Sequence, residues 1–226
     1  MKEIVTEEIK IPAKKTDYEF IAQIVIVVVL ASLLVYNFGK LNIGSTGGVT
    51  GGVIGTVSAS EIIPKGIPEV YGKELGVSYD DVSAATPQKA DITINILGNL
   101  DITITLTGAD LQRYIDIASQ ISCEYCCGAE SIIFSDGEAA CGCAHSYAMR
   151  GLAKYLLKNH GAEYTDDGIL EELGKWKVLF FPGIHETKAA VLKSKGIELS
   201  YINLASNKYR GIEQGQESGG GMVGGC

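Results

Sequence analysis

The longest uninterrupted apolar stretch of the chain is FIAQIVIVVVLASLLVYNF, residues 20–38, which has no charged residue across its 19 positions. At a rise of about 1.5 Å per residue, a helix of this length nearly spans the roughly 30 Å hydrocarbon core of a bilayer. A core helix of a globular protein seldom runs this far without a polar face. We therefore expect residues 20–38 to form one transmembrane helix in contact with the lipid bilayer.

The residues that flank this stretch indicate how it is processed and oriented. No convincing A-x-A cleavage site follows it, so we interpret it as an uncleaved signal anchor. Four lysines lie in the segment 1–19, whereas only Lys40 follows the stretch closely. Such a bias places the preceding side in the cytoplasm. The sequence thus predicts a single-pass protein of the cell membrane, with a cytoplasmic tail at 1–19 and its C-terminal domain outside.

Two glycine-rich segments bound the remaining part of the chain. Residues 39–60 are rich in Gly, Ser, Thr and Val without helical periodicity, which is typical of a flexible linker. Residues 214–226 contain most of the run EQGQESGGGMVGGC and are predicted to be disordered. The tail still carries two soft metal ligands, Met222 and Cys226. We expect an extracytoplasmic α+β metal-binding domain over residues 61–213.

Strict alternation of apolar and polar residues predicts strands within this domain. Ile92, Ile94 and Ile96 alternate with polar residues before a Gly-Asn pair, and a second alternating run at 102–106 follows it. This pattern is typical of a β-hairpin. SIIFSDGEAA predicts a second hairpin, and KVLFFP and IELSYINL predict two further strands.

Apolar residues at helical spacing predict helices between these strands. The clearest patterns lie in TGADLQRYIDIASQI, in AHSYAMRGLAKYLLKNHG and in HETKAAVLKSKG, with a shorter helix in TDDGILEELGKW. Gly151 lies on the apolar stripe of the second of these, which suggests close approach of another backbone. The fold class that we predict is α+β, a small mixed domain with β-hairpins and a Cys/His-rich knuckle, preceded by one transmembrane helix.

Composition and charge exclude some classes of function. The 226 residues carry a formal net charge of −8, and no stretch interleaves basic with aromatic residues. We therefore expect no binding of nucleic acid. The sequence has no P-loop and no arrangement of a familiar hydrolase, which favours a protein that is not an enzyme.

Candidate chemistry is concentrated in CEYCCG, residues 123–128, and ACGCAH, residues 140–145. A C-x-x-C pair followed by Gly, with a second ligand pair at the start of a helix, is the spacing of a tetrahedral zinc site. The predicted ligands are Cys123, Cys126, Cys143 and His145, with Cys141 and Cys127 as alternative or additional ligands. Zinc is the expected ion. Copper is the alternative, because a thiolate-rich site with a nearby methionine also suits Cu(I).

These residues also carry two resemblances. Knuckle, hairpin, and then a helix with ligands in its first turn resembles the treble-clef class of zinc domains over residues 123–160. Cys141-Gly142-Cys143, followed by His145 and a helix, is similar to bacterial secreted lipoproteins named for a Pro-Cys-Tyr-Cys-Gly-Cys motif. That resemblance implies an extracytoplasmic domain that binds a metal.

Other interpretations of the cysteines stay open. Outside the cell, clustered cysteines usually form disulfides, and a disulfide-braced surface interaction module is one alternative. Five cysteines within 21 residues cannot all pair without Cys226. A thiol–disulfide oxidoreductase using Cys126-Cys127 or Cys141-Cys143 is another alternative, and so is one disulfide beside one metal site. His185 is expected at the surface, and the sequence names no protein partner.

Overall fold

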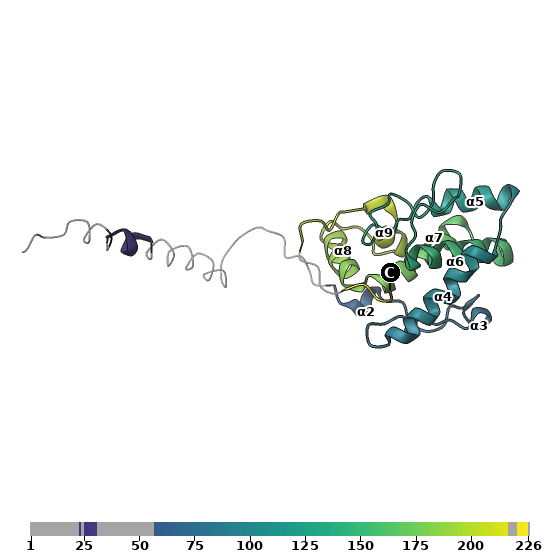
Figure 1. Ribbon diagram of the computed structural model, residues 1–226, viewed down its shortest axis with the longest axis horizontal. Coiled ribbons are helices and arrows are strands. Elements are labelled where there is room, and N and C mark those ends of the chain that lie inside the picture. Colours follow the sequence, from purple (N-terminus) through teal and green to yellow (C-terminus); the bar gives the residue numbers. More distant parts are fainter. Residues whose placement is uncertain (1–22, 24, 31–56, 217–220, 226) are drawn as a thin grey trace, which may run out of the picture. The chain divides into compact units, whose positions relative to one another are not determined.

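The structure is a computed structural model, and it describes Gln23, residues 25–30, residues 57–216 and residues 221–225. The chain divides into two compact units, Met1–Gly51 and Gly52–Cys226. In the first unit, the described residues are helical and exposed. The second unit is a helical domain (Figure 1). It contains all the cysteines whose positions are described.

The predicted transmembrane helix is wrong for the part of the chain that the structure describes. No helix within these residues is both long enough and apolar enough to cross a bilayer. Of the stretch 20–38, only Gln23 and residues 25–30 belong to the described residues, and the predicted tail 1–19 lies outside them. The single-pass topology and the location in the cell membrane, which were both inferred from this helix, are therefore not supported.

The domain consists of helices joined by ordered loops. Its elements are α2 (Ala59–Ile62), α3 (Gly72–Leu75), the 3-10 turn η1 (Tyr79–Asp81), α4 (Pro87–Thr103), α5 (Gly108–Ala118), α6 (Ala144–His160), α7 (Asp166–Phe180), α8 (Pro182–Ser194), α9 (Tyr201–Ala205) and η2 (Asn207–Tyr209). In the described ranges, strand pairing is limited to two isolated antiparallel bridges, Ile121 with Ser206 and Ile133 with Ala139. The predicted α+β class with β-hairpins is therefore wrong, and the domain is helical.

The first predicted hairpin is the helix α4, and tertiary packing explains the difference. Pro87 occupies the first turn, where its fixed φ favours a helix start. The side of α4 that is buried repeats every three to four residues, through Ala90, Thr93, Ile94, Leu97 and Gly98. Ile92 and Ile102 are exposed in this helix. The alternation of apolar and polar residues had predicted both on the buried face of a hairpin. Burial against α6 thus outweighs the β-propensity of the isoleucines and threonines.

The other predicted strands are wrong for similar reasons. Residues 131–140 fold back through a turn, but only the bridge between Ile133 and Ala139 forms. The apolar run KVLFFP is the C-terminal part of α7 and the start of α8, and IELSYINL leads into α9. The helix predicted to end before Gly161 is confirmed as α6, and α8 confirms the helix predicted around HETKAAVLKSKG.

Helix α6 lies at the centre of the domain and contacts α4, α5 and α7. Gly151 of α6 lies against the backbone of α4, where an added Cβ would overlap the Leu97 carbonyl oxygen and lie 2.8 Å from the Asp101 nitrogen. The close approach predicted at Gly151 is therefore confirmed. Two ion pairs of the Asp101 carboxylate tie the same helices together, to the buried Arg150 at 2.7 Å and to the partly buried Lys154 at 2.6 Å.

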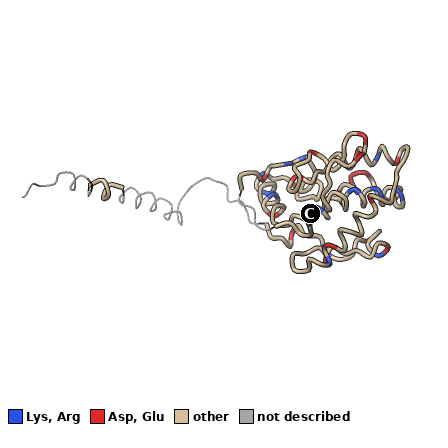
Figure 2. Tube along the Cα trace, in the orientation of Figure 1, with Lys and Arg blue, Asp and Glu red and all other residues tan. Residues whose placement is uncertain are grey.

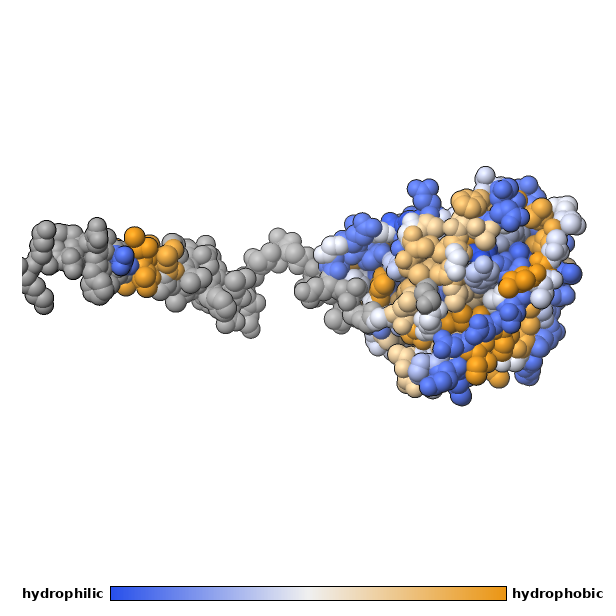
Figure 3. Space-filling view, in the orientation of Figure 1, coloured by the Kyte–Doolittle hydropathy of each residue, from blue (hydrophilic) through white to orange (hydrophobic). Residues whose placement is uncertain are grey.

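The charged residues and the apolar surface are both dispersed over the domain. Figure 2 shows basic and acidic residues interspersed along its helices and loops. The face seen in Figure 3 likewise mixes apolar with polar side chains. Such a mixture is ordinary for a folded domain, so the surface by itself does not direct attention to one functional region.

Candidate metal centre

Cys143 is the residue that caps the N-terminus of α6. Its backbone is extended, and its Sγ accepts a hydrogen bond from the Ser146 backbone N–H at 3.4 Å. The Ser146 hydroxyl lies 3.3 Å from the same sulfur. Unpaired N–H groups and the positive end of the helix dipole favour negative charge at this position. The start of α6 therefore stabilises a thiolate at Cys143.

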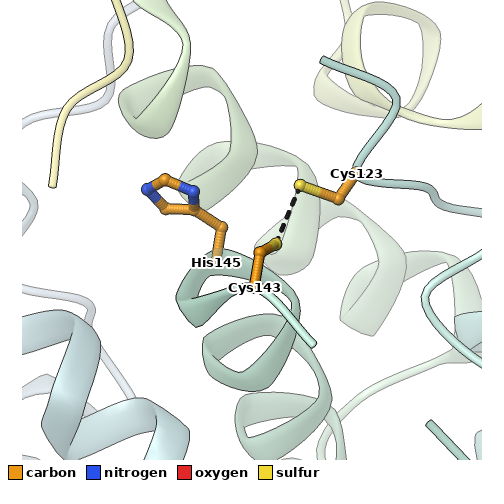
Figure 4. Close-up of side chains that lie close together, drawn as sticks. All are labelled: Cys123, Cys143 and His145. Atoms are coloured by element: carbon orange, nitrogen blue, oxygen red, sulfur yellow. Dashed lines mark hydrogen bonds between the residues drawn. The ribbon is translucent and has the colours of Figure 1, made fainter. Parts of the chain in front are cut away.

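Cys123 approaches Cys143 from the loop that follows α5. Neighbouring contacts fix this loop: Ile121 pairs with Ser206, and the N–H groups of Cys126 and Cys127 donate to the Cys123 carbonyl at 3.3 and 3.4 Å. The Cys123 side chain is fully buried, and its Sγ lies 3.2 Å from that of Cys143 (Figure 4). Two sulfurs separated by 20 positions in the sequence thus meet in the interior.

The two sulfurs differ in acidity because of their surroundings. Hydrogen bonds from the Cys123 thiol, from His145 and from Ser146 outweigh partial burial and lower the pKa of Cys143 to about 3. The same contact between the sulfurs, together with burial, raises the pKa of Cys123 well above its ordinary value. Cys143 is therefore the thiolate and Cys123 the thiol that donates to it. A bound cation would favour the thiolate form of both.

His145 completes the group with a fixed ring orientation. Its Nε2 lies 2.8 Å from the Val223 carbonyl oxygen, which can only accept a hydrogen bond, so Nε2 carries the proton. The His145 side chain also forms a hydrogen bond with Cys143, which helps to lower the pKa of that cysteine. In Figure 4 one ring nitrogen lies on the side of the two sulfurs and the other on the far side. The ligand atoms of Cys123, Cys143 and His145 all lie within 4.8 Å of one another, so this group can hold a metal ion.

The C-terminal tail supports His145, although residues 214–226 were predicted to be disordered. Val223 is buried, and its N–H donates to the Phe180 carbonyl at 2.8 Å. The Gly225 N–H donates to Asp91 at 3.2 Å. Gly224 has a φ of +81°, and a Cβ there would overlap the Ile94 side chain. Residues 221–225 of the tail are therefore shaped to lie over the histidine.

Aromatic rings enclose the other faces of the imidazole. The ring centroids of His145 and Phe180 are 4.5 Å apart, and those of His145 and Phe181 are 5.1 Å apart. Both phenylalanines are buried near the junction between α7 and α8. The ring is therefore held by packing as well as by its hydrogen bond, as a preorganised ligand must be.

A disulfide joins Cys127 to Cys141 beside this group. Cys127 belongs to an exposed turn, whereas Cys141 is buried, with its Sγ 3.6 Å from the Cys143 sulfur. The Cys141 carbonyl accepts a hydrogen bond of 2.8 Å from Arg150, the same residue that pairs with Asp101. The structure thus contains one disulfide next to one group of metal-ligand residues.

Buried charges lie next to Cys123 along the chain. The Glu124 carboxylate is 3.0 Å from the Lys177 ammonium, 3.8 Å from that of Lys188 and 3.5 Å from Arg210. Burial lowers the pKa of Lys177 to about 8 in spite of Glu124. His185 is also fully buried in this region, so its predicted surface position is wrong.

The predicted ligands divide into three sets in the structure. Cys123, Cys143 and His145 come together, Cys127 and Cys141 form the disulfide, and Cys126 is exposed and outside the group. Sequence reasoning missed Val223, because nothing in a glycine-rich tail indicates that a carbonyl 78 positions away will meet the histidine.

Neither protein-family models, nor curated proteins, nor solved structures yield a match to this chain. The functional interpretation therefore rests on the geometry of this centre.

Proposed function

We propose that this protein binds a transition-metal ion, zinc in the simplest case, through Cys123, Cys143 and His145. The observation that carries the proposal is the orientation of His145. Metal-binding histidines usually donate their second ring N–H to a carbonyl or carboxylate, which fixes the tautomer and aims the lone pair at the ion. The bond from Nε2 to the Val223 carbonyl is of this kind.

The identity of the ligands favours zinc, with copper as the alternative. Zinc is commonly bound by combinations of Cys and His, with Zn–S distances of about 2.3 Å. Copper(I) is also bound by soft thiolate ligands. Tetrahedral geometry at the zinc distance separates two thiolate sulfurs by roughly 3.8 Å. The separation of 3.2 Å between Cys123 and Cys143 therefore has to widen by about half an ångström, which side-chain rotation can supply.

The metal would have a structural role in this centre. Its ligands come from the loop after α5 and the start of α6, and the tail fixes the histidine. An ion bound here links three segments that are distant in the sequence, so its binding free energy adds to the stability of the folded state. Removal of the ion with a chelator should lower the melting temperature and loosen residues 123–160.

The test compares matched variants of the full chain. Elemental analysis of protein purified without oxygen should find zinc or copper in the parent. His145→Gln and Cys123→Ser should lose most of the metal, because each removes one ligand. Cys126→Ser is the control, since Cys126 is exposed and outside the group. A parent without metal, or equal metal content in Cys123→Ser and Cys126→Ser, would refute the proposal.

A thiol–disulfide oxidoreductase is the second candidate, and one observation favours it. The Cys143 thiolate lies 3.6 Å from the Cys141 sulfur of the disulfide, and its pKa is lowered to about 3. Thiol–disulfide exchange needs such an arrangement of thiolate and disulfide. Sustained reduction of insulin by the protein, lost in Cys143→Ser but retained in His145→Gln, would support this function over metal binding.

A further inference from the structure

The disulfide sulfur of Cys141 lies next to the proposed metal ligands. It is 3.6 Å from the Cys143 sulfur, which in turn lies 3.2 Å from that of Cys123. Two thiolates that share a tetrahedral zinc ion are separated by roughly 3.8 Å. The distance from the Cys141 sulfur to that of Cys143 therefore already matches two ligands of one ion, but the bond to Cys127 withholds the thiolate that binding requires.

We propose that Cys141 is a fourth metal ligand, released by reduction of its disulfide with Cys127. This inference rests on the metal binding proposed above. With the disulfide intact, the centre offers two cysteines and one histidine. With the disulfide reduced, it offers three cysteines and one histidine, which is a common set for a closed structural zinc site. The redox state of one bond thus determines how firmly the protein holds its metal.

The backbone around Cys141 is fixed independently of the disulfide. The Cys141 carbonyl accepts from Arg150, whose side chain is buried and paired with Asp101 of α4. The N–H of the preceding Ala140 donates to the Ile132 carbonyl at 3.2 Å. These contacts do not involve sulfur, so they remain after reduction. Cys141 should therefore stay beside Cys143 when Cys127 separates from it.

The two ends of the disulfide differ in access. Cys127 is exposed and Cys141 is buried, so an external dithiol reaches the Cys127 sulfur first. Attack by its thiolate forms a mixed disulfide with Cys127, and the electron pair of the broken S–S bond leaves on Cys141. The second thiol of the reagent then displaces Cys127 as a thiolate and closes the reagent into a cyclic disulfide. Two electrons pass from the dithiol to the protein, and the Cys141 thiolate is formed beside the ligands.

The experiment measures zinc affinity of the full chain by competition with a chromogenic chelator. The parent should bind zinc at least about 100-fold more tightly after reduction by a phosphine, because one thiolate ligand has been added. Cys127→Ser and Cys141→Ser form the matched pair, since each removes the same disulfide. Cys127→Ser leaves Cys141 free and should bind tightly with or without reductant. Cys141→Ser should bind weakly under both conditions.

Equal zinc affinity of Cys127→Ser and Cys141→Ser would overturn the inference. If that shared affinity still depends on His145, the proposed function survives, whereas loss of binding in every form would refute both. A second measurement avoids variants altogether. In the reduced parent, zinc should protect Cys123, Cys141 and Cys143 from alkylation and leave Cys127 reactive, as peptide mass spectrometry can show. Alkylation of Cys141 at the rate of Cys127 would also overturn the inference.

Discussion

Replacement of Gly151 by alanine tests the close contact between α6 and α4. A Cβ at this position would overlap the Leu97 carbonyl oxygen and lie 3.1 Å from the Leu100 Cβ. A backbone carbonyl cannot rotate away, so the two helices must separate. Overpacking typically costs about 1–3 kcal/mol, and the backbone clash favours the upper end. Alanine recovers about 1 kcal/mol of helix propensity, which leaves a net loss of about 2 kcal/mol in the free energy of unfolding.

Gly98, on the facing helix α4, provides the matched control. A Cβ there would lie 3.4 Å from the Tyr147 Cβ, an ordinary contact distance. Gly98→Ala should therefore gain up to about 1 kcal/mol from helix propensity. Urea denaturation followed by circular dichroism should then separate the two variants by about 3 kcal/mol, the sum of these effects. Equal unfolding midpoints for both variants would show that the helices are not this close.

Gly151→Ala should also affect zinc binding at the candidate metal centre. Separation of α4 from α6 would disturb the pair between Asp101 and Arg150, and Arg150 holds the Cys141 carbonyl. Gly151→Ala should therefore also weaken zinc binding, although it changes no ligand. Parent-like zinc affinity in a destabilised Gly151→Ala would show that the helix crossing and the centre are independent.

Two further predictions concern the tail and the buried histidine. Gly224→Ala should weaken zinc binding about 10- to 100-fold, because the tail can no longer place the Val223 carbonyl on His145. Gly221→Ala, where a Cβ meets no atom within 4 Å, should bind zinc like the parent, and equal loss in both would contradict the role of the tail. Burial, with the nearby Lys177 ammonium, holds the pKa of His185 well below its usual range. As pH falls below about 6.5, the unfolded chain takes up a proton there that the folded state does not, so the free energy of unfolding falls by up to about 1.4 kcal/mol per pH unit. His185→Gln should flatten this dependence in urea titrations between about pH 5 and pH 7. Hydrogen bonds to Glu163 and Glu74 outweigh partial burial and raise the pKa of His160, so protonation of His160 stabilises the folded state at low pH. His160→Gln should therefore make the free energy of unfolding fall more steeply as the pH is lowered. An unchanged slope in His185→Gln would show that this ring is not neutral in the folded protein.

Local patterns determined part of what the structure contains. The apolar stripe that includes Gly151 predicted α6 and the position of its end, because a long run of apolar residues at helical spacing is typical of a helix. The clustering of cysteines near that helix located the group of residues that can hold a metal ion. The position of Cys143 and His145 at the first turn followed directly, since both residues are adjacent to the helix start in the sequence.

Tertiary structure decided the rest. Ile92 and Ile102 have high β-propensity, yet they lie on an exposed side of α4, because burying Leu97 and Gly98 against α6 is worth more than the local preference. The choice among the five cysteines of residues 123–143 also depended on distance in space. C-x-x-C spacing favoured Cys126, but the turn exposes Cys126 and directs Cys123 inward to Cys143. The carbonyl that orients His145 belongs to Val223, in a glycine-rich tail that has no pattern of apolar and polar residues from which a structure could be predicted. Contacts of this kind form only when distant segments share one core. The sequence alone therefore determined helices such as α6 and α8 and the neighbourhood of the site, whereas packing determined that α4 is a helix and which residues belong to the site.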